Sequence, residues 1–344
     1  MRLGRREMSK VLDQGAGWAV RAGMGDVRDL DFLEEGGCLA GADPERVSKR
    51  AYERGRGQLG TLGSGNHFVE IQYVDEIFDA HAATALGLFE NQVTITIHTG
   101  SRGLGHQVCS EHLKGMVSAA QRYGIELPDR QLCCAPLRSA EGKGYLAAMA
   151  AAANFAFANR QVMTHWVRES FAEILGASFG GVGIEVLYDV CHNIAKYESF
   201  DFDGQERRLC VHRKGATRAY PPGHPQTPEP YREVGQPVLI PGDMGRYSYV
   251  LVGTKKAYEE TFGSTCHGAG RRLSRRQAKR QTRGRDLFSE MESHGVVVMA
   301  AGSATVAEEM PEAYKDVADV VDVVQNAGIS SKVARLRPMG VIKG

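Results

Sequence analysis

The feature that most constrains the fold is an alanine-rich stretch at 144–175, GYLAAMAAAANFAFANRQVMTHWVRESFAEIL. Its composition is helix-forming throughout, so one long helix is expected there. Strand-like runs of alternating or β-branched residues stand apart from it, and further strands are predicted by the same pattern. Helices and strands alternate irregularly and the short strands look antiparallel, which favours an α+β fold over a doubly wound sheet. The predicted strands lie at 67–74, 92–99, 182–190, 207–212, 237–241, 248–254 and 295–302.

Composition excludes several classes of protein. The chain has 344 residues, of which 42% are hydrophobic, enough to fill a sizeable core. Its 42 basic and 41 acidic residues nearly cancel, so only local charge clusters are informative about partners. The seven cysteines include no CxxC pair, which favours a reduced, cytoplasmic protein. The first residues lack the apolar core of a signal peptide, and no run is long enough for a membrane span.

A glycine-rich loop, GTLGSGNHFVEI at 60–71, leads into the first predicted strand. Glycines would let the backbone approach a ligand closely, with Asn66, His67 and Glu70 projecting from the loop and the strand. Strand alternation places Phe68 and Glu70 on one face and His67 on the other. Such a loop also serves simply to turn a corner, so binding and structural roles are both open.

Three histidines occupy similar positions in the predicted structure. His98 ends the strand-like run TITIH, with Arg102 in a following loop suited to an anion. His192 follows the apolar run 182–190 at a predicted strand-to-helix junction. Singly, His67, His98 and His192 are more often structural residues. Together, each beside a polar residue at a strand end, they predict a site for Zn, Mn, Fe or a related ion.

A fourth histidine, His267, lies in the stretch GSTCHGAGRRLSRRQAKRQ at 263–281. A helix starting near Gly270 would favour an anion at its free amides and align Arg271, Arg275 and Lys279 in one cationic stripe. The stretch predicts a polyanion as partner, the alternative being a solvated surface helix. Facing a phosphate, His267 could act as a hydrogen-bond donor or as a nucleophile.

The carboxy-terminal stretch AGISSKVARLRPMGVIKG is apolar and β-like before its last residues. A terminal segment of this kind would ordinarily be a disordered tail. Here the pattern allows Lys343 to be delivered to a site as a phosphate or base contact.

Seven ordered motifs resemble those of the RtcB family of RNA-splicing ligases: QLGTLGSGNHFVEI, IHTGSRGLGHQV, DVCHNIAK, VHRKGATRA, STCHGAGR, EEMPEAYKDV and KVARLRPMGVIKG. The resemblance extends from about Val11 to Gly344. It implies a ligase that uses GTP and Mn²⁺ to join RNA ends bearing a 2′,3′-cyclic phosphate or 3′-phosphate to 5′-hydroxyl ends. It also implies one large domain over residues 1–344, with mixed sheets and surrounding helices, and archease as a partner.

The same resemblance assigns roles to individual residues. His267 is implied as the nucleophile that takes GMP from GTP, and His67, His98 and His192 as the manganese ligands, with two ions in the family. Arg102, Arg271 and Arg275 match positions expected to hold RNA or similar anions. The implied guanylate-binding residues are Asn66, Phe68, Glu70, Asp243, Ser248, Gly268, Gly270, Arg271, Tyr314 and Lys343.

Two departures from the family pattern stand out. The family carries an upstream DxGCG element whose Asp and Cys complete the manganese site, and no such sequence precedes Gly60. Asp243 stands where many members have serine. The chain is therefore expected to represent the larger, C-terminal part of a ligase, binding manganese weakly and impaired in ligation.

Two other interpretations are open. In one, the chain is a nucleotide- or RNA-binding relative without ligase activity. In the other, it is a metal-dependent phosphoesterase that uses the same histidines. Covalent labelling with GTP separates the ligase from both.

Overall fold

The computed structural model describes residues 1–344, which form two compact units. The helical unit comprises 1–61 and 99–189, and the sheet unit comprises 62–98 and 190–344. Each unit is built from two separate segments, so no single cut along the sequence divides them. Each has its own cluster of buried apolar side chains. The expected α+β class, with a mixed sheet and surrounding helices, is confirmed.

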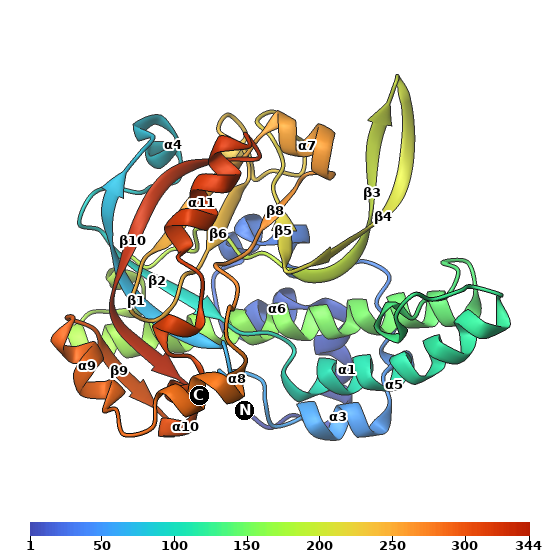
Figure 1. Ribbon diagram of the computed structural model, residues 1–344, viewed down its shortest axis with the longest axis horizontal. Coiled ribbons are helices and arrows are strands. Elements are labelled where there is room, and N and C mark those ends of the chain that lie inside the picture. Colours follow the sequence, from blue (N-terminus) through green and yellow to red (C-terminus); the bar gives the residue numbers. More distant parts are fainter. The chain divides into compact units, whose positions relative to one another are not determined.

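The helical unit is organised around α6 (Ala140–Leu175), which contacts α1, α2 and α5 (Figure 1). The predicted long helix is confirmed, and it begins at Ala140 because the Ser139 side chain accepts a hydrogen bond from the amide of Gly142. Small alanines let neighbouring helices approach, and Phe155 fills the core between them. The other α-helices of this unit are α1 (Arg5–Gln14), α2 (Ala16–Arg21), α3 (Lys49–Gly55) and α5 (Arg102–Arg122). Its 3₁₀ turns are Val27–Phe32, Glu34–Gly37, Pro44–Arg46, Arg130–Leu132 and Phe179–Val182.

A buried asparagine on α6 ties together backbone segments that are distant in sequence. The Asn159 side-chain oxygen accepts from the amides of Gly60 at 2.7 Å and Thr61 at 3.1 Å. Its amide group donates to the carbonyls of Thr61 at 3.1 Å and Gly100 at 3.2 Å. These bonds satisfy polar groups that would otherwise be buried without partners.

The sheet unit is centred on β10 (Ser330–Lys343). This strand pairs antiparallel with β1 and β7 and parallel with β9, in the order β2-β1-β10-β7-β6. Figure 1 shows β10 as a long curved strand with α11 beside it. The other sheet strands are β1 (Phe68–Ile77), β2 (Val93–His98), β6 (Pro237–Ile240), β7 (Ser248–Gly253) and β9 (Val297–Ala300). The predicted strands at 67–74, 92–99, 237–241, 248–254 and 295–302 are thus confirmed.

Two smaller strand pairs complete this unit. The β3–β4 hairpin extends away from the main sheet (Figure 1) and contains the predicted strand 207–212. A short pair, β5 with β8, leads to His267. The bounds are β3 (Asn193–Phe202), β4 (Gln205–Lys214), β5 (Ala216–Arg218) and β8 (Ser264–Cys266). The helices are α4 (Ala80–Ala85), α7 (Lys255–Thr261), α8 (Arg275–Gln281), α9 (Leu287–Ser293), α10 (Ser303–Glu308) and α11 (Val317–Asn326), with 3₁₀ turns at Glu229–Tyr231 and Pro311–Ala313.

The predicted strand at 182–190 is wrong. A 3₁₀ turn occupies its start, Gly183 has a positive φ of 69° that interrupts an extended run, and one bridge from Asp189 to Leu33 is its only ladder pairing. His192 therefore follows no strand. It precedes β3, and the helix expected after it is also wrong.

The helix expected near Gly270 begins instead at Arg275. Ser274 caps it by accepting from the Gln277 amide, while the Gln277 side chain returns to the Ser274 amide. Gly270 lies in the preceding loop with a φ of 75°. Arg271 is therefore outside the helix and cannot belong to a stripe with Arg275 and Lys279.

Candidate active site

Four histidines from separate parts of the chain form a row in the sheet unit. The ring centres of His67 and His98 lie 5.9 Å apart, and those of His98 and His192 lie 5.2 Å apart, both edge to face. His192 stacks on His267 with ring centres 4.5 Å apart. His67 precedes β1, His98 ends β2, His192 precedes β3 and His267 follows β8. The structure thus brings together the three predicted metal ligands and the predicted nucleophile.

The surroundings of two of these rings favour the neutral imidazole. Burial, with the nearby His192, His67, His267 and Lys343, holds the pKa of His98 well below its ordinary value. Burial also lowers the pKa of His267, partly opposed by a hydrogen bond with the Gly215 backbone. A neutral imidazole has the free lone pair that both a metal ligand and a nucleophile require.

The spacing of the histidine rings suits a shared metal ion, although their nitrogen atoms are not arranged as a complete metal site. With metal–nitrogen bonds of about 2.1 Å, two imidazoles on one ion have ring centres roughly 5 Å apart. The His98 Nδ1 atom is buried without a hydrogen-bond partner. No group of three His, Cys, Asp or Glu side chains is arranged to hold a metal ion. Small side-chain movements would therefore accompany metal binding.

A polar pocket in the same unit collects seven of the predicted guanylate-binding residues. Its lining comes from the glycine-rich loop, the sheet strands and two intervening loops. Its free volume is about 10 Å³, room for one water molecule, so a larger ligand requires the side chains to move. The predicted members are Asn66, Phe68, Glu70, Asp243, Ser248, Tyr314 and Lys343, and the others are Gly242, Met244 and Glu309.

Lys343 reaches this pocket because it ends a paired strand. Val69 on β1 opposes Ile342 on β10, and Lys343 itself opposes Ala300 on β9. Its side chain is buried, with Nζ 5.3 Å from the centre of the Phe68 ring. Burial lowers the pKa of Lys343, opposed by the carboxylates of Glu309, Glu70 and Asp243. The β-like approach predicted for this segment is confirmed.

Two carboxyl groups of the pocket are shifted toward their neutral forms. Burial raises the pKa of Glu70 to about 8, against the opposing influence of Lys343 and of Gln72, whose Nε2 donates to Glu70 Oε1 at 2.5 Å. Burial raises the pKa of Asp243 to about 6, although the Gly245 amide donates to its Oδ1. Near neutral pH, Glu70 can therefore offer a proton as well as accept one.

Glu309 organises one side of the pocket and was not predicted. Its Oε2 accepts from the Tyr314 hydroxyl and lies 2.9 Å from Arg271 Nη1, which also donates to the Tyr314 oxygen at 3.1 Å. The Arg271 guanidinium lies 5.0 Å from the centre of the Tyr314 ring. Arg271 and Tyr314 are thus held by one buried carboxylate. The sequence offered a weak signal, a glutamate five positions before a predicted site residue.

The remaining predicted residues lie around the pocket or outside the unit. Arg275 opens α8, and a Cβ added at Gly65 would lie 3.2 Å from its Nη2, so it borders the glycine-rich loop. A Cβ at Gly268 would lie 3.3 Å from the Pro241 carbonyl oxygen. Arg102 belongs to the helical unit, where its Nε donates to Thr61 Oγ1 at 3.0 Å.

The fold and the site define an α+β protein with a row of histidines and, in the same unit, a lysine-bearing polar pocket. Comparison with known proteins then identifies the family. The chain belongs to the tRNA-splicing ligase RtcB family, whose pattern it matches over residues 1–344.

Individual relatives are similar in sequence to this chain along its whole length. The tRNA-splicing ligase RtcB of Archaeoglobus fulgidus is 58% identical over 344 residues, covering all of this chain and 71% of the relative. That of Thermococcus kodakarensis is 56% identical, with the same coverage. That of Pyrococcus furiosus is 58% identical over 345 residues, and this chain spans 36% of its length. No helix combines the length and apolarity needed to cross a membrane.

Proposed function

We propose that the protein is a GTP- and Mn²⁺-dependent RNA ligase. It joins RNA ends bearing a 2′,3′-cyclic phosphate or 3′-phosphate to 5′-hydroxyl ends through a guanylylated His267. Residues 1–344 are its catalytic domain, working in the cytoplasm with archease as a protein partner. The observation that carries the proposal is the gathering of seven expected guanylate-binding residues in one pocket. Membership of the tRNA-splicing ligase family supports the reaction class.

The first step uses His267 as the nucleophile. A Cβ at Gly215 would lie 3.6 Å from Cε1 and 3.8 Å from Nδ1 of His267, so that ring edge faces the Gly215 backbone. The Nε2 lone pair is left to attack the α-phosphorus of GTP. The new bond joins nitrogen to phosphorus, and the bond to the departing pyrophosphate breaks. The Gly215 backbone stabilises the positive charge that develops on the ring.

Two further displacements complete the ligation. An oxygen of the RNA 3′-phosphate attacks the phosphorus on His267, which breaks the nitrogen–phosphorus bond and activates the RNA end with GMP. The 5′-hydroxyl then attacks the 3′-phosphate and GMP leaves. A cyclic phosphate is opened by water beforehand. The chain's part is to orient these groups, with Arg271 and Arg275 as the expected phosphate contacts of the sheet unit.

His67, His98 and His192 are the residues that would hold manganese. Imidazole nitrogens bind first-row divalent ions, although Mn²⁺ prefers oxygen ligands, and the unpartnered Nδ1 of His98 is a buried donor atom suited to a ligand. A bound ion would neutralise charge on the reacting phosphates. Because these three ligands are neutral, weak binding is expected.

Labelling with GTP tests the proposal. The protein is incubated with α-³²P-labelled GTP and Mn²⁺, and the label is expected on His267 with acid-labile, base-stable chemistry. Joining of a 3′-phosphate RNA to a 5′-hydroxyl RNA is followed in parallel. Absence of both label and joined product would overturn the ligase. Cleavage of RNA end phosphates without GTP would then identify a phosphoesterase, and RNA binding alone a non-catalytic relative.

A further inference from the structure

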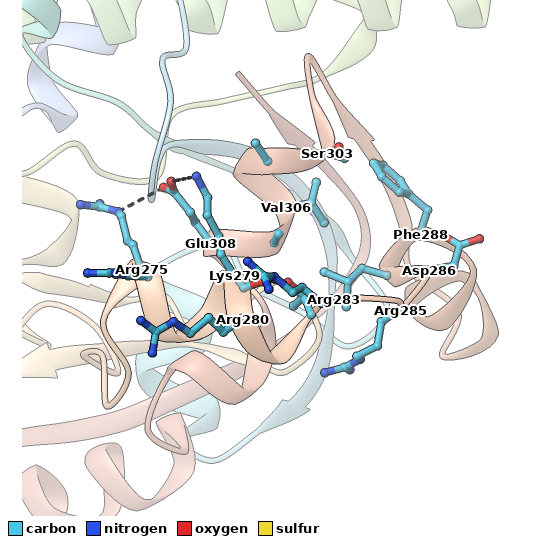
Figure 2. A pocket seen from close by; sticks show the side chains of 15 residues that line it. Arg275, Lys279, Arg280, Arg283, Arg285, Asp286, Phe288, Ser303, Val306 and Glu308 are labelled. Carbon is cyan, nitrogen blue, oxygen red and sulfur yellow. Dashed lines mark hydrogen bonds and ion pairs between the residues drawn. The ribbon is translucent and has the colours of Figure 1, made fainter.

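A groove of about 1010 Å³ lies among α8, α9 and α10, and its lining residues are not those of the guanylate pocket (Figure 2). Six arginine or lysine side chains line it, against only two carboxylates. Such an excess of one charge on a concave surface attracts an oppositely charged ligand.

Only part of this charge is compensated within the protein. Glu308 lies 2.6 Å from Lys279 and 3.4 Å from Arg275, as the dashed lines in Figure 2 mark. Asp286 caps α9 by accepting from the Ser289 amide. Arg285 is held by Glu290 at 2.5 Å and Glu312 at 2.9 Å. The two carboxylates of the groove, its one lysine and two of its five arginines are therefore already engaged.

Three arginines remain uncompensated. Arg276, Arg280 and Arg283 are exposed, and their side chains make no ion pair or hydrogen bond. In Figure 2 the Arg280 side chain extends away from Glu308. Arg276 and Arg280 stand one helical turn apart on α8, a spacing comparable to that of neighbouring phosphates along a nucleic-acid strand. They form a short cationic track without a protein partner.

The groove also offers an aromatic surface. Phe288, in the first turn of α9, is 36% exposed and lines the groove together with these arginines. Cationic side chains beside an accessible aromatic ring match a single nucleic-acid strand, whose phosphates bind the charges while a base stacks on the ring. An acidic peptide would satisfy the arginines and leave the ring unused.

We propose that this groove binds a single-stranded segment of RNA, with its phosphates at Arg276, Arg280 and Arg283 and a base stacked on Phe288. The inference rests on the proposed function, since it adds a contact for the RNA of that reaction. It places this contact outside the residues expected to bind GTP. Because phosphates and base faces are common to all sequences, the contact is largely independent of RNA sequence.

The test uses a fluorescent RNA of about 12 nucleotides, within the range of known single-strand sites. Its ends are a 5′-phosphate and a 3′-hydroxyl, which the proposed reaction does not join. Binding to the full chain is measured by anisotropy across a KCl series. The variant R276Q/R280Q is expected to lose affinity, with the slope of log K against log [KCl] reduced by about 1.4. Phe288→Leu is expected to weaken binding roughly tenfold with an unchanged slope.

A matched control variant distinguishes the loss of this site from a general loss of positive charge. The variant K255Q/K256Q removes the same charge from α7, where both lysines are paired with glutamates, and is expected to bind RNA like the parent. Equal losses in the arginine and lysine variants would overturn the proposal. The proposal would also be overturned if R276Q/R280Q kept the salt slope of RNA binding but lost binding of a glutamate-rich peptide. That result would identify an acidic protein segment as the occupant of the groove.

GTP labelling on the same preparations distinguishes failure of the groove from failure of the proposed function. The variants R276Q/R280Q and Phe288→Leu are expected to label like the parent. If the parent does not label but the RNA results hold, the groove stands without the ligase. If the parent labels and the RNA results fail, the groove is wrong and the ligase stands.

Discussion

The rings of His192 and His267 lie face to face, with centres 4.5 Å apart and planes 12° from parallel. His192 is one of the expected metal ligands, and His267 is the expected nucleophile. Their loops come from different strand pairs, β3–β4 and β5–β8. Each ring shields the other from water, so a substitution at His192 is expected to change the basicity of His267 as well as metal binding.

The first prediction concerns covalent labelling. His267→Ala is expected to abolish incorporation of label from GTP, because no other imidazole of the row borders the Gly215 backbone in the same way. Incorporation is measured on denaturing gels. The control is His212→Ala, an exposed histidine on β4. Equal labelling of His267→Ala and the parent would rule out this nucleophile.

The second prediction is a pH dependence of stability due to Glu70. In the unfolded chain this carboxyl releases its proton near its ordinary pKa of 4.5, whereas in the folded protein its pKa is about 8. Between these values the folded state holds the extra proton. The contribution of Glu70 to the free energy of unfolding therefore falls as pH rises, by up to about 1.4 kcal/mol per pH unit.

Comparison with Glu70→Gln isolates this contribution, since glutamine does not titrate. Urea unfolding of both proteins is measured between about pH 5 and pH 8. The parent is expected to lose stability relative to the variant across this window and to keep a constant difference above it. A difference independent of pH would show that Glu70 is ionised in the folded protein throughout.

The third prediction concerns the carboxylate that compensates α8. Glu308→Gln frees Lys279 and weakens the restraint on Arg275. Single-stranded RNA is expected to bind more tightly, with a salt slope steeper by about 0.7 for each cation released. Anisotropy titrations across a KCl series give both quantities. Glu312→Gln is the control, because Arg285 keeps its contact with Glu290. Weaker binding by Glu308→Gln would contradict the prediction.

The fourth prediction concerns the buried asparagine of α6. Asn159→Ala removes the partners of the Gly60 and Thr61 amides and of two carbonyls. It is expected to lower the free energy of unfolding by about 2–4 kcal/mol. Chemical denaturation measures the loss, with Asn326→Ala at the exposed end of α11 as the control. A loss no larger than that of the control would show that these backbone groups do not depend on Asn159.

The sequence predicts a strand where apolar or β-branched residues recur along it, as in β1, which is recognisable although Glu70 and Gln72 are buried on it. Periodicity was sufficient for β1, β2, β6 and β7. It missed β3, in which Lys196 and Glu198 are buried. Arg213 on β4 compensates the buried charge of Glu198 by donating to it from both terminal nitrogens, at 2.6 and 2.8 Å. That pairing depends on the hairpin register, which local composition does not reveal.

The site shows the same division. Glu309 lies in the motif EEMPEAYKDV like Tyr314, but its role depends on the contacts with Arg271 and Tyr314, which the motif alone does not reveal. The start of α8 could have been predicted correctly. Ser274 and Gln277 have the spacing of a capping box, a better helix-start signal than the preceding glycine.

The central position of β10 governs when the sheet unit can form during synthesis. Its partners β1 and β7 are made first, and Val69 must wait for Ile342 to leave the ribosome. Until then both strands expose unpaired edges, a state prone to misassociation. Pairing of β1 with β10 also requires the closure of a very long loop. The same strand carries Lys343 into the pocket. A nascent chain that has not reached β10 therefore has neither a closed sheet nor a complete site, so partial products of translation do not acquire the pocket ahead of the fold.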